Sequence, residues 1–580
     1  MGVAGLMAAS FASCDDFLDD NRYPLSDQIA NAAFWNNPNN VQGQINYFYE
    51  DFLGYGNSSG AGDFYFKYLS DDQAQGTSEA FVKQWTFTNI PTKADAWNDP
   101  YIEIRRANLI IEGVANSTMA QSDRDNFTAI ARMMRGYQYY LLVRAYGDVP
   151  LIEKALDPVD EAELFGPRTP RNTVMDFAID DLTYACENIA TTASKNAFSS
   201  DLAKAIKTEL CLFEASYARY HAKDEARAQK YYTEVVNVAA PLVAKYPIGD
   251  DYHAVYNSFR AALSSNSEII FMKEYEPDVL MHCTVDYTSS SSPVAGMTKD
   301  AFDAYLFRDG KPLALTSLNR SDVGKQFPRM AADGKTQLKD DKGNPLFNYS
   351  ILEPLSVRDG RLMAITDTAV YYDGLQYQRP NSMLMTSLTG YGVNKFNNPA
   401  MPESYTTTIK NYTCAPIYWG AYIAMNLVEA KAELGTLTDA DLTNTMNKLM
   451  ARADLPNVTV ASMTAMNDPA NNMGVSSLIW EVRRCRRCEF IFDKAIRYWD
   501  LVRWHQLELL DTQKHPNIGL GANVSAAPVA VANVNGYLNA IGNTSRVFTA
   551  REYFYPVPSG QIQLNSALTQ NPGWASEDED

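Results

Sequence analysis

The stretch that decides the fold is FTAIARMMRGYQYYLLVRAYGDVPL, residues 127–151. Its apolar side chains recur at intervals of three and four residues, which is the spacing of one face of an α-helix. That face consists of Ile130, Met134, Tyr137, Leu141 and Ala145. Gly147 and Pro150 follow at once, and both residue types favour the end of a helix. The sequence therefore predicts a long amphipathic helix that ends near Gly147.

Similar apolar faces recur along the chain and predict further helices. They cover 174–189, 206–217, 226–243 (ending near Pro241) and 423–434, with a short partner helix at about 440–452. Paired helices with alanine at points of close approach are typical of tetratricopeptide-like repeats, although the strict repeat signature is absent. We therefore expect a mainly α-helical fold, a tetratricopeptide-like superhelix with a long loop-rich insertion and few short strands.

The helical pattern of apolar residues is replaced by a different pattern between residues 261 and 417. Short apolar runs alternate there with turn-rich stretches such as DYTSSSSP (286–293) and YYDGLQYQRP (371–380). Loops of this extent on a rigid scaffold usually carry binding sites. The expected organisation is a signal peptide at 1–13, a lipid anchor and linker at 14–40, an N-terminal helical region at 41–260 and a C-terminal region at 261–580, the last divided into loop-rich 261–417, helical 418–510 and an irregular tail at 511–580.

Composition narrows the class of partner. The formal net charge is −19, which argues against a nucleic-acid ligand because such proteins usually show a basic patch or stripe. A neutral or cationic partner suits this charge better, with a local basic patch left open. Aromatic residues make up 12% of the chain, and tyrosine is the largest share. Tyrosine and tryptophan suit packed cores and half-wet binding surfaces alike.

The N-terminal stretch SFASCDDFLDD (10–20) predicts a membrane anchor. Residues 1–13 carry no charge and have the length of the apolar part of a signal peptide, but they lack its basic start, so the true start is expected upstream. Phe11 to Cys14 resembles the bacterial lipobox, whose cysteine is lipidated and becomes the mature N-terminus. The alternative is an incidental cysteine in an apolar terminus. Lipid chains anchor a protein by burying methylene groups at ~0.8 kcal/mol each.

The search for catalytic motifs is mostly negative. GNSSG (56–60) matches the G-x-S-x-G pattern, but the strand–turn–helix context of a serine-hydrolase elbow is missing. Cys485 and Cys488 form a C-x-x-C inside a stretch that reads as one helix, 481–504, so we expect buried or half-buried thiols rather than a zinc or redox site. No metal site is predicted from the five scattered histidines.

RYWDLVRW (497–504) is expected to be a packing motif. Arg497, Asp500 and Arg503 are spaced three apart, so one carboxylate can serve both guanidinium groups. Trp499 and Arg503 are four apart, which lets the arginine lie on the indole ring.

Six blocks in order resemble the RagB/SusD family of surface glycan-binding lipoproteins. The blocks are SCDDFLDD (13–20), RGYQYYLLVRAYGDVPLI (135–152), TGYGVNKF (389–396), IYWGAYIAMNLVEAKAELG (417–435), CEFIFDKAIRYWDLVRW (488–504) and REYFYPVPSGQIQLNSALTQNPGW (551–574). The departures are the Cys485/Cys488 pair, Ala495 where glycine is usual, and the missing basic start.

The resemblance implies a surface lipoprotein of Bacteroidetes-type bacteria, held in the outer membrane through Cys14 and addressed to the cell surface by the acids that follow. It implies a binding protein without enzymatic activity that captures a glycan or oligosaccharide and delivers it to a SusC-like TonB-dependent transporter. No cofactor is implied, and a structural calcium ion is left open.

No family motif fixes the residues that contact the ligand, so the candidates are positional. They are Trp85, Tyr65, Tyr287, Tyr372 and Tyr377 for stacking on sugar rings, with Asp71, Asp72, Gln376 and Arg379 as polar partners. The alternative for each is packing in the core or in a turn. The alternative function is a helical-repeat lipoprotein that binds peptide or protein in the same uptake architecture, and a surface hydrolase is the third hypothesis.

Overall fold

The structure is a computed structural model that describes residues 32–60, 62–64, 70–75, 89–284, 295–331, 333–371, 387–406 and 409–574. At 377–378 and 384–385 it describes the backbone alone.

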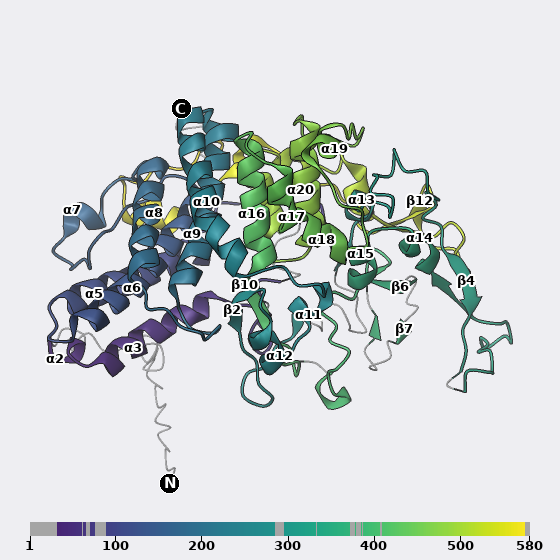
Figure 1. Ribbon diagram of the computed structural model, residues 1–580, viewed down its shortest axis with the longest axis horizontal. Coiled ribbons are helices and arrows are strands. Elements are labelled where there is room, and N and C mark those ends of the chain that lie inside the picture. The colour runs from purple at the N-terminus through teal and green to yellow at the C-terminus, as the bar shows by residue number, and fades with distance from the viewer. Residues whose placement is uncertain are drawn as a thin grey trace, which may run out of the picture.

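A row of long helices forms one side of the molecule (Figure 1). Successive helices pack against each other in chain order, and the last helix of the N-terminal half, α10, packs against α16 of the C-terminal half. The row consists of α5 (Asp95–Ala115), α6 (Gln121–Tyr146), α8 (Arg171–Asn188), α9 (Ser200–Tyr217), α10 (Glu225–Lys245), α16 (Gly420–Glu433) and α20 (Ser477–Glu489). This arrangement confirms the mainly helical fold that the sequence predicts.

Helix α6 ends where the sequence predicts. Gly147 caps it with φ of 73°, a conformation that glycine adopts without the strain of a side chain. The expected end of α10 near Pro241 is wrong, because the helix continues to Lys245. Pro241 cannot donate to the carbonyl of Asn237, but Asn237 is exposed and water can satisfy that oxygen. Helix α5 was not predicted from the sequence.

The stretch 481–504 is not one helix, which corrects the sequence-based expectation. Helix α20 ends at Glu489, and α21 (Ile496–Arg503) begins seven residues later. In between, Phe492, Lys494 and Ala495 have positive φ values of 68°, 45° and 56°. The left-handed conformation at Ala495 is one that glycine adopts with less strain, which explains why glycine suits this position.

Short helices fill the spaces around the row. They are α2 (Ala32–Trp35), α3 (Pro38–Asn46), α7 (Glu161–Leu164), α11 (Tyr252–Tyr256), α12 (Arg260–Ser265), α13 (Lys299–Ala304), α14 (Leu352–Ser356), α15 (Gly360–Ile365), α17 (Asp439–Thr443), α18 (Met446–Arg452), α19 (Val460–Thr464) and α22 (Ser559–Leu564). The π-helical turn η3 (Ala218–Ala222) and the 3₁₀ helices η2 (Tyr47–Asp51), η5 (Glu403–Tyr405), η6 (Leu507–Leu510), η7 (Pro516–Gly519) and η8 (Ala550–Tyr553) complete the set.

The strands are short and form several small antiparallel sheets, mostly in the loop-rich part of the chain. The pairs are β1 (Gln73–Gln75) with β3 (Ala295–Met297), β2 (Ile269–Lys273) with β10 (Ala415–Trp419), and β7 (Tyr377–Gln378) with β8 (Leu384–Met385). A four-stranded sheet has the order β4 (Lys325–Pro328), β5 (Phe347–Ser350), β6 (Thr366–Val370), β9 (Tyr391–Val393). A three-stranded sheet has the order β11 (Leu520–Asn523), β13 (Tyr537–Asn539), β12 (Asn533–Val534).

One apolar core runs through the helical row and into the C-terminal half. Its largest buried side chains include Trp419 and Trp504, which are fully enclosed. Many of the aromatic residues therefore belong to the core, as the sequence suggested. Among the described residues, no helix combines the length and apolar character that crossing a bilayer requires.

Candidate functional site

Most of the ligand-contact candidates lie outside the described residues. These are Tyr65, Trp85, Tyr287, Tyr372, Gln376 and Arg379. For Tyr377 only the backbone is described, as part of β7. The described residues that flank these positions, together with Asp71 and Asp72, define the site that the fold can support.

The chain flanking Trp85 and the chain flanking Tyr287 meet in the ribbon formed by β1 and β3. Gln75 is the last described residue before the interval 76–88, and Ala295 is the first after the interval 285–294. The two are direct partners in the antiparallel register. One end of each interval therefore adjoins the described fold at this ribbon.

The interval that contains Tyr372 adjoins the same region. It lies between β6 and β9, which pair with Val370 opposite Tyr391. Ser387 and Thr389, just after this interval, pack so closely on Gly296 of β3 that a Cβ atom there would collide with both hydroxyl groups. A side chain at position 296 would therefore force Ser387 and Thr389 to move. Described ends of three intervals with aromatic candidates adjoin one small region of the fold.

Asp71 and Asp72 hold this region against the helices. Arg497 donates to both carboxylate oxygens of Asp71, at 2.9 and 2.7 Å, and Nε of Arg487 donates to Asp72 at 2.7 Å. Burial raises the pKa of Asp71, but the charges of Arg487 and Arg497 outweigh it and hold the pKa below its ordinary value. Burial raises the pKa of Asp72. Both carboxylates are thus engaged by arginines that the sequence did not identify as their partners, and sugar contact by either stays a prediction.

A cavity of about 440 Å³ adjoins Asp71. It lies between α13, α20, the segment 312–320 and η7, and its size falls within the range of about 300–1,000 Å³ typical of ligand pockets. Its charged wall consists of Arg320, Arg483, Arg484, Arg487 and Arg497 with Asp71, Asp300, Asp303 and Asp468. The sequence analysis missed this cavity. The available signal was RRCRRC (483–488), which places Arg484 and Arg487 three apart on one side of a helix.

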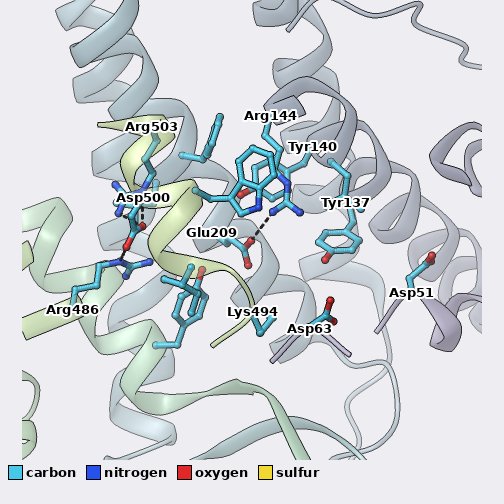
Figure 2. Close-up of a pocket in the computed structure, with 16 residues that line it drawn as sticks. Asp51, Asp63, Tyr137, Tyr140, Arg144, Glu209, Arg486, Lys494, Asp500 and Arg503 are labelled. Carbon is cyan, nitrogen blue, oxygen red and sulfur yellow. Dashed lines mark hydrogen bonds and ion pairs between the residues drawn. The ribbon is translucent and has the colours of Figure 1, made fainter. Parts of the chain in front are cut away.

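A second, smaller chamber of about 90 Å³ lies where α6, α9 and α21 meet (Figure 2). Arg144 points toward Glu209, 3.9 Å away, and its guanidinium lies 4.3 Å from the Trp499 ring centroid. The chamber has room for a few water molecules but is below the size of a typical ligand pocket. We interpret it as the polar centre of the core.

RYWDLVRW packs in this core as expected, but with different partners. Asp500 bridges Arg503 and Arg486 (Figure 2). Arg497 binds Asp71 instead. The expected contact between Trp499 and Arg503 is also wrong. Arg144 covers Trp499, and Arg503 lies over the neighbouring Trp504 ring. Spacing along one helix could not predict these partners because they come from other helices.

The remaining motifs carry no catalytic arrangement. Cys485 and Cys488 are buried free thiols, and burial raises the pKa of Cys485 to about 11. GNSSG forms a tight turn closed by a bridge between Asn57 and Gly60, and the described residues just after it, 62–64, are not the helix that a nucleophile elbow needs. Within the described ranges, no group of three or more His, Cys, Asp or Glu side chains is placed to hold a metal ion.

The fold and the site place the protein in the class of helical-repeat scaffolds that carry a loop-bearing face and an adjoining cavity. The chain belongs to the SusD family, since the model of that family matches residues 267–574, more than half of the 580 residues. A second family model, described as starch-binding and associating with the outer membrane, matches residues 16–210.

Curated relatives match part of the chain. A SusD-like protein of Bacteroides ovatus is 28% identical over 158 residues, which are 26% of this chain and 29% of that protein. SusD-like protein P2 of Formosa agariphila is 31% identical over 138 residues, 23% of this chain and 26% of that protein. In these matches the chain spans less than a third of the length of each relative.

Solved structures have a similar fold over most of this chain. A SusD-like carbohydrate-binding protein from Bacteroides fragilis has a TM-score of 0.65 at 18% identity, covering 92% of this chain and 100% of the other. Surface glycan-binding protein A from Bacteroides fluxus has a TM-score of 0.54 at 16% identity, covering 92% and 99%.

Proposed function

We propose that the protein captures a glycan or oligosaccharide at the cell surface and passes it to a SusC-like TonB-dependent transporter of the outer membrane, without chemical change to the ligand. The observation that carries the proposal is that described residues flanking three aromatic-bearing intervals lie together at the β1–β3 ribbon of a SusD-family fold. Solved relatives described as carbohydrate-binding and glycan-binding support the choice of ligand.

The chemistry of capture follows from the residue types in those intervals. Aromatic rings offer flat apolar faces to the C–H faces of a sugar, and Asn, Asp, Gln and Arg side chains bond to its hydroxyl groups. A scaffold of packed helices holds the anchors of the intervals in place, which limits the entropy lost on binding. We assign the ligand contacts to Trp85, Tyr65, Tyr287, Tyr372 and Tyr377, with Gln376 and Arg379 as polar partners.

Replacement of Trp85 by alanine tests the site. We expect about tenfold weaker binding to the glycans that bind in an array of neutral and acidic oligosaccharides, because loss of one stacking ring costs ~1.4 kcal/mol. The midpoint of thermal unfolding should not change. The matched control is Phe165→Ala, an exposed aromatic residue at the end of α7.

Three results would contradict this assignment. If Trp85→Ala binds the glycan as tightly as the wild type, Trp85 does not belong to the site. If the variant loses stability as well as affinity, Trp85 is a core residue instead. Binding of peptides by a protein that binds no glycan would replace the glycan by a peptide.

Replacement of Cys14 by alanine tests the anchor. We expect the variant to move from the membrane fraction to the soluble fraction, because a lipid attached at Cys14 is the proposed link to the outer membrane. Cys186→Ala, which removes a half-buried thiol elsewhere, should stay with the membrane. Equal fractionation of wild type and Cys14→Ala would refute lipid attachment at this residue.

A further inference from the structure

The cavity beside Asp71 presents unused hydrogen-bond donors. Arg484, Arg487 and Arg497 line it, with side chains only 5%, 10% and 7% exposed. Each uses Nη2, in two cases with Nε, to bind carboxylates. Nη1 of all three makes no hydrogen bond to the part of the chain that the structure describes. These buried guanidinium groups therefore keep free N–H groups.

The carboxylates of the wall are already engaged. Asp468 accepts from Arg484 and from Nε1 of Trp480, at 2.5 and 3.1 Å, and Asp300 accepts from Arg487 at 2.9 Å. Asp71 accepts from Arg497 as described above. Asp303, the remaining acid of the wall, accepts from Lys299. Asp71, Asp300 and Asp468 thus fix the arginines in place, and the groups left to face a ligand are donors. A complementary ligand must supply acceptors, and a carboxylate or sulfate accepts from guanidinium groups most strongly.

The rest of the wall suits a sugar ring. Half-buried Trp480 is held by its bond to Asp468, and Leu313, Met473 and Ile518 add apolar surface. The rim is in solvent, where Asn472 and Asn517 are exposed. Among the described residues, the guanidinium of Arg320 donates to the carbonyl of Thr316 alone. A cavity with an indole, apolar side chains and amide groups at the rim matches the mixed surface of a saccharide.

We infer that this cavity binds an acidic sugar residue, one that carries a carboxylate or a sulfate ester, with Arg484 and Arg320 as the groups that select the anion. The inference deepens the proposed function and rests on it, because it names the class of glycan. It places a second contact region beside the β1–β3 ribbon, and Asp71, which holds the ribbon against the helices, also lines this cavity.

Calorimetric titration with three tetrasaccharides of equal length tests the inference. One contains glucuronic acid, one carries sulfate esters on neutral sugars, and one is neutral. We expect the wild-type protein to bind at least one acidic probe ten times or more tightly than the neutral probe. The probe that binds distinguishes carboxylate from sulfate.

Two variants locate the selectivity. Arg484→Gln should weaken binding of the acidic probe at least tenfold, and the change in affinity for the neutral probe should be below twofold. Because Arg484 also pairs with Asp468 and Glu481, its loss could disturb folding. Arg320→Gln, at an exposed position, gives the independent test and should weaken acidic binding about threefold. Arg308→Gln, an exposed arginine outside the cavity, is the control.

The outcomes separate this inference from the proposed function. Equal affinity for acidic and neutral probes, or unchanged acidic binding in Arg320→Gln, overturns the acidic-sugar site. If Trp85→Ala still weakens neutral binding about tenfold, glycan capture stands. If no glycan of any class binds, in the array or in the titration, both proposals fail.

Discussion

Glu429→Gln is expected to lower the free energy of unfolding by about 3–5 kcal/mol, because it leaves a buried arginine without a full counter-charge. Glu429 of α16 is fully buried and accepts from Arg503 and from Nε1 of Trp504, at 2.7 Å in each case. Burial alone would raise the pKa of this carboxyl, but the charge and hydrogen bonds of Arg503 hold it at about 2. Glutamine keeps the size of the side chain and removes the charge.

Chemical denaturation at neutral pH measures the effect. The matched control is Glu508→Gln, since Glu508 is exposed and its ion pair with Lys514 spans 3.8 Å. Exposed pairs contribute about 0–1 kcal/mol, so the control should change little. If both variants lose the same small amount of stability, the Arg503–Glu429 pair does not hold α21 against α16.

Lys395→Met is expected to destabilise the protein by about 3–5 kcal/mol at pH 7.5. Lys395 is completely buried, lies 2.7 Å from Asp493 and also donates to the carbonyl of Ile491. Its ammonium lies 4.0 Å from the centroid of the Tyr256 ring, and Tyr256 in turn donates to Asp493. The change leaves Asp493 buried without its cation.

The pH dependence gives this prediction a distinct signature. Burial raises the pKa of Asp493 to about 6 even with Lys395 present, and removal of the cation raises it further. A carboxyl with a raised pKa binds a proton more readily in the folded state, so its contribution to stability is lost as the pH rises. The deficit of Lys395→Met should therefore shrink by roughly 1–2 kcal/mol between pH 7.5 and pH 5.5.

Unfolding curves at the two pH values measure this difference. Lys410→Met, the same change at an exposed position, is the control, and its free energy of unfolding should match that of the wild type at both pH values. A deficit that stays constant between pH 7.5 and 5.5 would show that Asp493 does not titrate in the variant.

These two ion-pair networks explain what the family-like motifs do in this chain. RYWDLVRW and GYGVNKF supply Arg503 and Lys395, each of which reaches an acid or a carbonyl on a different element. The helical row and the loop-rich part of the chain are joined through such buried charges. The motifs therefore describe the framework of the protein rather than its ligand.

Net charge was a poor guide to the cavity. The value of −19 favoured a neutral or cationic partner, whereas the arginines of α20 and α21 create a local set of donors. Net charge sums over the whole surface, but an enclosed pocket responds to the groups within a few ångströms of its wall. The acidic-sugar inference depends on this local arrangement.

The sequence alone determined most of the long helices and the end of α6, because apolar spacing and a capping glycine such as Gly147 act through neighbours in the chain. It also indicated the family, because the six sequence blocks can be recognised in their order without knowledge of the fold. Only the tertiary structure decided that Arg497 binds Asp71, 426 residues away, and that Asp500 binds Arg486 rather than Arg497. Periodicity places a side chain on one face of its own helix, whereas its partner depends on the path of the whole chain through space.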